Sequence, residues 1–179
     1  MSYEFLPTKV AIPFYTRPDW ESPIPRSKKL KRKQRRDAMW ICLATLTNTK
    51  IHHCGLLLTR NNNSVLVVSG EEHRSKIIDE AAYHSKILEP VSVIELGEMD
   101  VSVQQMTNYL TTPHRISRKD LWWYTVLGQF IFPTAQPRSC TLLVCQMLRM
   151  IDFRIKDFVV PRDLYQYLKQ IYPVKAWGD

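Results

Sequence analysis

The chain has 179 residues, of which 45% are apolar and 23% are charged, enough for one domain with a sizeable core. Prolines at positions 7 and 13 interrupt the N-terminus, and no apolar run approaches the length of a membrane span, so we expect neither a secretion signal nor a transmembrane segment. The four cysteines lie within or beside apolar runs, which predicts a reduced protein, and they lack the spacing of a structural zinc site. They are Cys42, Cys54, Cys140 and Cys145.

The net charge of +8 is concentrated near the N-terminus. Residues 1–36 contain 10 Lys and Arg against 3 Asp and Glu, together with five prolines, a composition that cannot form its own core. We therefore expect an extended basic arm at residues 1–37 and the domain at residues 38–179. The partner expected for this arm is a protein assembly or an anionic molecule, nucleic acid included, and the alternative is a solvated tail. The basic residues concerned are Lys28, Lys29, Lys31, Arg32, Lys33, Arg35 and Arg36.

Three strands are predicted in the first part of the domain. Residues 39–46 and 51–58 are apolar and are separated by a polar turn, and the asparagines at 61–63 form a second turn into residues 64–69. Short strands that follow one another with turns between them predict an antiparallel meander.

Helices surround one further strand in the rest of the chain. Residues 77–88 have helical spacing up to Pro90, residues 91–96 are strand-like, and Asp100 or Ser102 can cap a short helix that ends at Leu110. Residues 117–130 and a segment that begins at Pro161 also have helical patterns. The elements predict an α+β fold, a small antiparallel sheet packed with helices.

Cys140 stands at the start of a predicted buried helix. Ser139 is a suitable N-cap, and apolar residues recur at helical spacing as far as Ile151. The positive end of the helix dipole stabilises a thiolate at this place, and the thiolate is the nucleophilic form of cysteine. Cys140 is therefore a candidate nucleophile, and the alternative is an ordinary buried cysteine, as we expect Cys145 to be.

His53 is the best candidate for the base that such a nucleophile needs. All five histidines precede Cys140, which excludes the papain-type order with the cysteine first. His53 lies near the beginning of a predicted strand, and alternation places His52 on the opposite face. The other three fall in helical or loop segments, where we expect solvated side chains; they are His73, His84 and His114.

Short motifs around these two residues resemble those of circularly permuted papain-like hydrolases. Residues 53–58 (His-Cys-Gly-Leu-Leu-Leu) resemble the His strand of this group, which includes permuted relatives of the NlpC-type peptidases, the YiiX-like proteins and the lecithin-retinol acyltransferases. Residues 139–144 (Ser-Cys-Thr-Leu-Leu-Val) look like the cysteine motif. Residues 160–165 (Val-Pro-Arg-Asp-Leu-Tyr) are similar to the Pro-x-Asp-Leu helix start that often follows it. The resemblance spans about residues 38–170, consistent with one domain.

The resemblance implies a cysteine peptidase, amidase or acyltransferase that acts through a thioester, with Cys140 as the nucleophile and His53 as the base. The backbone N–H groups at the start of the Cys140 helix would help to hold the oxyanion. Family members place a polar residue, often Glu, on the strand after the His strand, where this chain has Val-Val-Ser at residues 67–69. Glu71 or Ser69 can replace it, or a backbone carbonyl can orient the imidazole, and Glu71 can equally be a solvated loop carboxylate. No metal or other cofactor is expected.

Three functional interpretations stay open. The first is a hydrolase of peptidoglycan or protein. The second is a catalytically inactive structural protein of a large assembly, such as a bacteriophage particle, attached through the basic arm; a phage particle can also carry an active wall-degrading domain. The third, a nucleic-acid-binding module, rests on residues 26–36 alone and predicts binding that weakens steeply with salt. The location expected from these interpretations is the cytoplasm or a virion.

Overall fold

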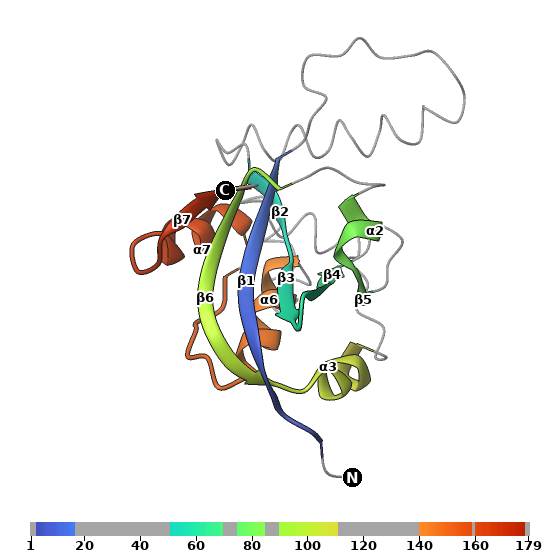
Figure 1. Cartoon of the computed structure of the whole chain (residues 1–179). Helices are drawn as coiled ribbons and strands as arrows, with labels where there is room; N and C mark the ends of the chain where they lie inside the picture. Colours follow the sequence, from blue (N-terminus) through green and yellow to red (C-terminus); the bar gives the residue numbers. More distant parts are fainter. Residues whose placement is uncertain are drawn as a thin grey trace, which may run out of the picture.

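The computed structural model describes residues 3–16, 51–69, 75–84, 90–110, 140–158 and 160–177. These residues form seven strands and four helices (Figure 1). The elements are β1 (Leu6–Thr16), β2 (Ile51–Cys54), β3 (Leu56–Arg60), β4 (Asn63–Ser69), β5 (Ser75–Asp79), α2 (Glu80–His84), β6 (Ser92–Val101), α3 (Val103–Leu110), α6 (Cys140–Arg149), α7 (Pro161–Leu168) and β7 (Val174–Ala176). The strands form one antiparallel sheet in the order β5-β4-β3-β1-β6-β7, and β2 also pairs with β1. The predicted antiparallel sheet packed with helices is confirmed.

The central strand β1 comes from the segment assigned to the arm. It pairs with β6 from Leu6 to Phe14, and its other side pairs with β3 and β2. Every second side chain in the middle of β1 is buried in the main core, namely Val10, Ile12 and Phe14. Residues 6–16 therefore belong to the domain, and the assignment of this segment to an extended arm is wrong. The rest of that expected arm, residues 17–37 with its seven basic side chains from Lys28 to Arg36, lies outside the described residues.

The second and third strands of the predicted meander correspond to β2, β3 and β4, with β3 and β4 paired as a hairpin, while the first predicted strand lies outside the described residues. The turn between β3 and β4 places both Asn61 and Asn62 at positive φ, 48° and 64°, as a two-residue hairpin turn requires. A helix was expected from residue 77, but residues 75–79 form a strand because Ile77 packs against the main core and Ile78 against the opposite face. The helix begins only at Glu80, and residues 85–89 lie outside the description.

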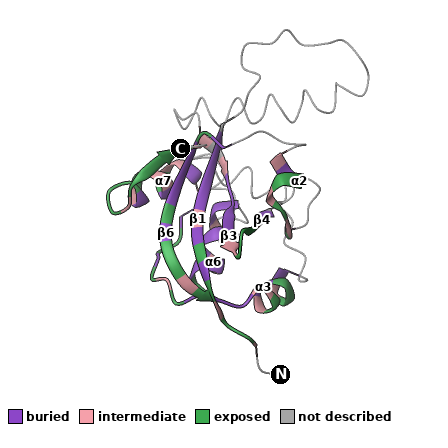
Figure 2. Cartoon of the chain, in the orientation of Figure 1, coloured by how far each residue is buried: buried purple, intermediate pink, exposed green. Residues whose placement is uncertain are grey.

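Helices α6 and α7 cover one face of the sheet (Figure 1). Seven residues of α6 are buried, and Figure 2 shows this helix and the upper half of β1 in the colour of buried residues. A smaller apolar cluster on the opposite face joins Tyr15 and Tyr83 to side chains of β3 and β4. The main core therefore anchors the start of α6 against β2 and β4.

Two predicted helix starts are confirmed. The Ser102 Oγ accepts a hydrogen bond from the Gln105 N–H at 3.4 Å and caps α3, and α7 begins at Pro161. The predicted strand at 39–46 and the predicted helix at 117–130 fall outside the described residues. Within the described parts of the chain, no helix is long and apolar enough to cross a membrane.

Candidate active site

Cys140 is the first residue of α6 and lies beside β2. Its side chain is buried, with the residue 5% exposed, and the next residue, Thr141, is fully buried. The Thr141 Oγ1 lies 3.9 Å from the Cys140 Sγ and 3.9 Å from the Cys54 Sγ. The helix start thus brings the predicted nucleophile next to a second thiol, on a strand that is far away in the sequence.

The surroundings of Cys140 favour its thiolate. A hydrogen bond from the Cys54 thiol is the largest influence and holds the pKa of Cys140 well below its ordinary value, against the opposing effect of burial. The positive charge of His53 and a hydrogen bond from its ring lower this pKa further. The predicted pair of Cys140 and His53 is therefore in contact in the folded chain.

The other two described cysteines are held as thiols. Burial raises the pKa of Cys54 well above its ordinary value, and its hydrogen bond to Cys140 acts in the same direction. Burial also raises the pKa of Cys145, which lies further along α6. Among these three cysteines, only Cys140 has a lowered pKa.

The imidazole of His53 packs against Tyr15. The two residues face each other across the β1–β2 pair, their ring centroids are 5.6 Å apart, and the ring planes are inclined by 40°. The Tyr15 hydroxyl forms a hydrogen bond of 3.2 Å with the Nε2 of His84. Tyr15 is therefore held between the predicted base and a second histidine.

The prediction that His84 is solvated is wrong. Its side chain is only 11% exposed, its ring centroid lies 4.9 Å from that of Trp177, and its Nδ1 lies 3.9 Å from a carboxylate oxygen of Glu80. The aromatic side chains shield His84 because the short helix α2 presents it to the second face of the sheet.

Several residues of this site have no signal in the sequence. Cys54 and Thr141 directly follow His53 and Cys140, but no local pattern predicts that these two neighbours meet. Tyr15 was assigned to the arm and had no predicted contact with the domain. Glu71, the candidate third member, lies outside the described residues. The part of the chain that the structure describes holds no group of three or more His, Cys, Asp or Glu placed to bind a metal ion.

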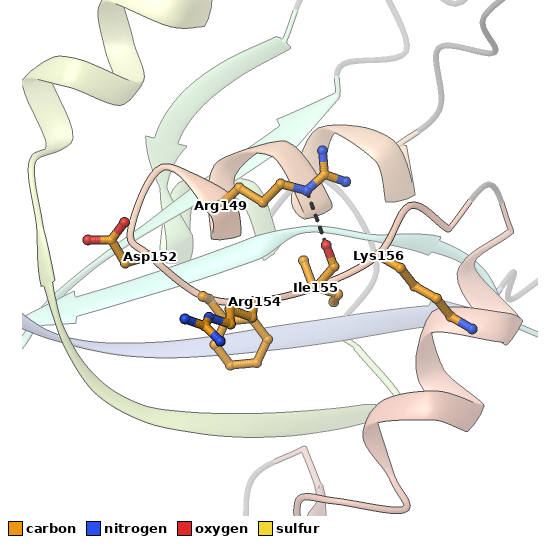
Figure 3. Close-up of a pocket in the computed structure, with 6 residues that line it drawn as sticks. Arg149, Asp152, Arg154, Ile155 and Lys156 are labelled. Carbon is orange, nitrogen blue, oxygen red and sulfur yellow. Dashed lines mark hydrogen bonds between the residues drawn. The ribbon is translucent and has the colours of Figure 1, made fainter.

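A surface hollow lies at the opposite end of α6 (Figure 3). It is lined by Arg149, Asp152, Phe153, Arg154, Ile155 and Lys156. Within it, the Arg149 Nε donates to the Ile155 carbonyl oxygen at 3.1 Å, and the Arg149 guanidinium pairs with Asp157. Because α6 separates this hollow from Cys140 by about 14 Å of helix, it is not part of the cysteine site.

Comparisons of the chain with protein-family models, with curated proteins and with solved structures find no match.

Proposed function

We propose that the chain is a cysteine hydrolase, a peptidase or amidase that acts on peptidoglycan or protein, with Cys140 as the nucleophile and His53 as the base. The observation that carries the proposal is the position of Cys140 as the first residue of α6, where Cys54 and His53 approach its sulfur and lower its pKa. Burial alone raises the pKa of a cysteine, as it does for Cys145, so the lowered pKa of Cys140 depends on the contacts that its sulfur makes.

The reaction would proceed through a thioester. The Cys140 thiolate attacks the carbonyl carbon, and backbone N–H groups in the first turn of α6 hold the oxyanion that forms. When the tetrahedral intermediate collapses, protonated His53 gives its proton to the leaving amine. His53 then takes a proton from water, the water attacks the thioester, and Cys140 leaves again as a thiolate.

Tyr15 takes the orienting role for which the sequence offered Glu71 or Ser69. Its ring packs against the imidazole of His53, and its hydroxyl is fixed by the hydrogen bond to His84. A third residue in such a site keeps the imidazole directed at the nucleophile, and a packed aromatic ring can do this without a charge.

The proposal includes a permuted papain-like arrangement. Its support is the order of the elements, with the histidine on a strand of the antiparallel sheet and the cysteine on a later buried helix, followed by Pro-Arg-Asp-Leu at the start of α7. A cytoplasmic or virion location and a partner for residues 26–36 belong to the same proposal and rest on the sequence.

The test is the rate at which iodoacetamide alkylates Cys140 as a function of pH, with peptide mass spectrometry to separate the cysteines. We expect a titration well below the value of about 8.5 for a free thiol, and a return toward that value in His53→Ala. Cys145→Ser is the matched control and should leave the profile unchanged. A p-nitrophenyl ester should then give a burst of nitrophenol and an acyl adduct on Cys140.

An inert Cys140, or a profile that does not respond to His53→Ala, would overturn the proposal. The inactive structural protein would then be the better interpretation of the fold.

A further inference from the structure

Cys54 is a buried nucleophile that the proposed hydrolysis does not consume. It lies on β2, is fully buried, and its thiol contacts both Thr141 and Cys140 at the start of α6. Cys145 is on the same helix as Cys140 and also lies close enough to Cys54 to raise the pKa of Cys54, but burial raises the pKa of Cys145 itself. The site thus contains two cysteines from different elements. Its surroundings favour the thiolate form of Cys140 and the thiol form of Cys54.

We propose that Cys140 and Cys54 form a reversible oxidation site for hydroperoxides, in which Cys54 resolves the oxidised Cys140 by forming a disulfide. The proposal uses the same thiolate as the proposed function, but it does not require acyl transfer. Its consequence is that peroxide would switch the nucleophile off without destroying it.

The chemistry has two steps. The Cys140 thiolate attacks one oxygen of hydrogen peroxide, a sulfur–oxygen bond forms, the peroxide bond breaks, and hydroxide leaves, so that Cys140 becomes a sulfenic acid. The Cys54 sulfur then attacks the Cys140 sulfur and forms the disulfide. The proton lost by Cys54 and the departing hydroxide make water. A dithiol reductant restores both thiols.

The contacts suit each step. The lowered pKa increases the share of Cys140 that is present as the attacking thiolate, and hydrogen peroxide is small enough to reach a residue that is only 5% exposed. The sulfur atoms of Cys54 and Cys140 both lie 3.9 Å from the Thr141 Oγ1, so the two sulfurs start the second step close together. Fast resolution protects Cys140 from the irreversible sulfinic and sulfonic acids.

The experiment treats the full reduced chain with hydrogen peroxide, blocks remaining thiols with iodoacetamide, and maps peptides without reduction. We expect a cross-linked peptide pair that contains Cys54 and Cys140, loss of Cys140 alkylation, and recovery of both thiols after dithiothreitol. Cys145→Ser should behave like the parent chain. In Cys54→Ser, and in Cys54→Ala if the serine variant does not fold, Cys140 should accumulate sulfenic acid that dimedone traps.

Several results would overturn the inference. These are a disulfide of Cys140 with Cys42 or Cys145, direct conversion of Cys140 to sulfinic acid in the parent chain, or no oxidation of Cys140. If Cys140 resists peroxide, yet its alkylation rate titrates at a lowered pKa, the inference fails and the proposed function stands. If Cys140 is inert to both reagents, both proposals fail.

Discussion

Cys54 and Cys140 have identical side chains, yet their pKa values shift in opposite directions. Cys140 receives a hydrogen bond from Cys54 and the charge of His53, whereas Cys54 is fully buried and keeps its proton for the bond that it donates. The surroundings of the pair therefore favour the thiolate at Cys140 and the thiol at Cys54.

Replacing Cys54 should make Cys140 less reactive at neutral pH. In Cys54→Ala the largest influence that lowers the pKa of Cys140 is lost, so the alkylation profile should move to higher pH. Because the thiolate is the reacting form, the rate below the new pKa should fall. The measurement is the iodoacetamide rate against pH, with Cys145→Ala as control; an unchanged profile would show that Cys54 does not stabilise the thiolate.

Tyr15 should affect His53 through its ring more than through its hydroxyl. Tyr15→Phe keeps the ring contact and loses the bond to His84, so we expect a loss of about 1 kcal/mol in unfolding free energy and little change at Cys140. Tyr15→Leu removes the ring, and its Cys140 profile should move toward that of His53→Ala. Denaturant unfolding and alkylation of the two variants separate these effects. Equal Cys140 profiles in the two variants would exclude positioning by the ring.

The local sequence was sufficient to identify Cys140 and His53 as candidates. A cysteine at a helix start and a histidine in an apolar strand are both visible in short windows. Tyr15 could not be identified in this way, because it meets His53 only after β1 has paired with β2. Contacts that depend on strand order have no local signature.

Gly55 separates β2 from β3 and is confined by its neighbours. A Cβ at this position would lie 3.1 Å from the Val67 carbonyl oxygen and 3.2 to 3.3 Å from side-chain carbons of Leu66 and Val68. The Gly55 N–H also donates to the carbonyl oxygen of Pro13 at 3.2 Å. A larger residue at this position would therefore need its neighbours in β4 to move by a few tenths of an ångström.

Gly55→Ala should destabilise the fold and displace the site. Since a backbone oxygen must move to admit the methyl group, we expect a loss of about 1–3 kcal/mol in unfolding free energy. His53 and Cys54 directly precede the glycine, so the alkylation profile of Cys140 should also change. Denaturant unfolding measures the first effect, and an alanine variant of full parental stability would contradict the steric argument.

The prediction missed β1 because prolines argue against a central strand. Pro13 is nevertheless tolerated there. Its carbonyl oxygen faces Gly55, which lies at the break between β2 and β3. The N–H that proline lacks therefore falls where the hydrogen bonds between the strands are already interrupted. Pro7 lies before Lys9, the first residue of β1 that pairs with β3. The turn at Asn61 and Asn62 and the cap at Ser102 were predictable, since each depends on its own few residues.

The N-terminal segment, residues 1–37, contains the strand β1 and the basic residues at 28–36, and the two parts need separate tests. Deletion of residues 1–16 removes the central strand and should abolish cooperative unfolding, because Val10, Ile12 and Phe14 leave the main core. Replacement of the lysines and arginines at 28–36 by glutamine should keep the fold, because Lys and Arg side chains seldom belong to a hydrophobic core. Circular dichroism during thermal unfolding distinguishes the two variants, and a cooperative transition after the deletion would contradict the role of β1.

The central position of β1 also determines the order in which the chain can assemble. Both neighbours of β1 come much later in the sequence, at residues 51–60 and 92–101, so its pairings are non-local and slow to form. Until β1 inserts, β3 and β6 each expose an unpaired edge, and such edges invite pairing with other chains. A chain without residues 1–16 lacks the common partner of these two strands, and a separate peptide of residues 3–16 that pairs with both as a donated strand should restore cooperative unfolding.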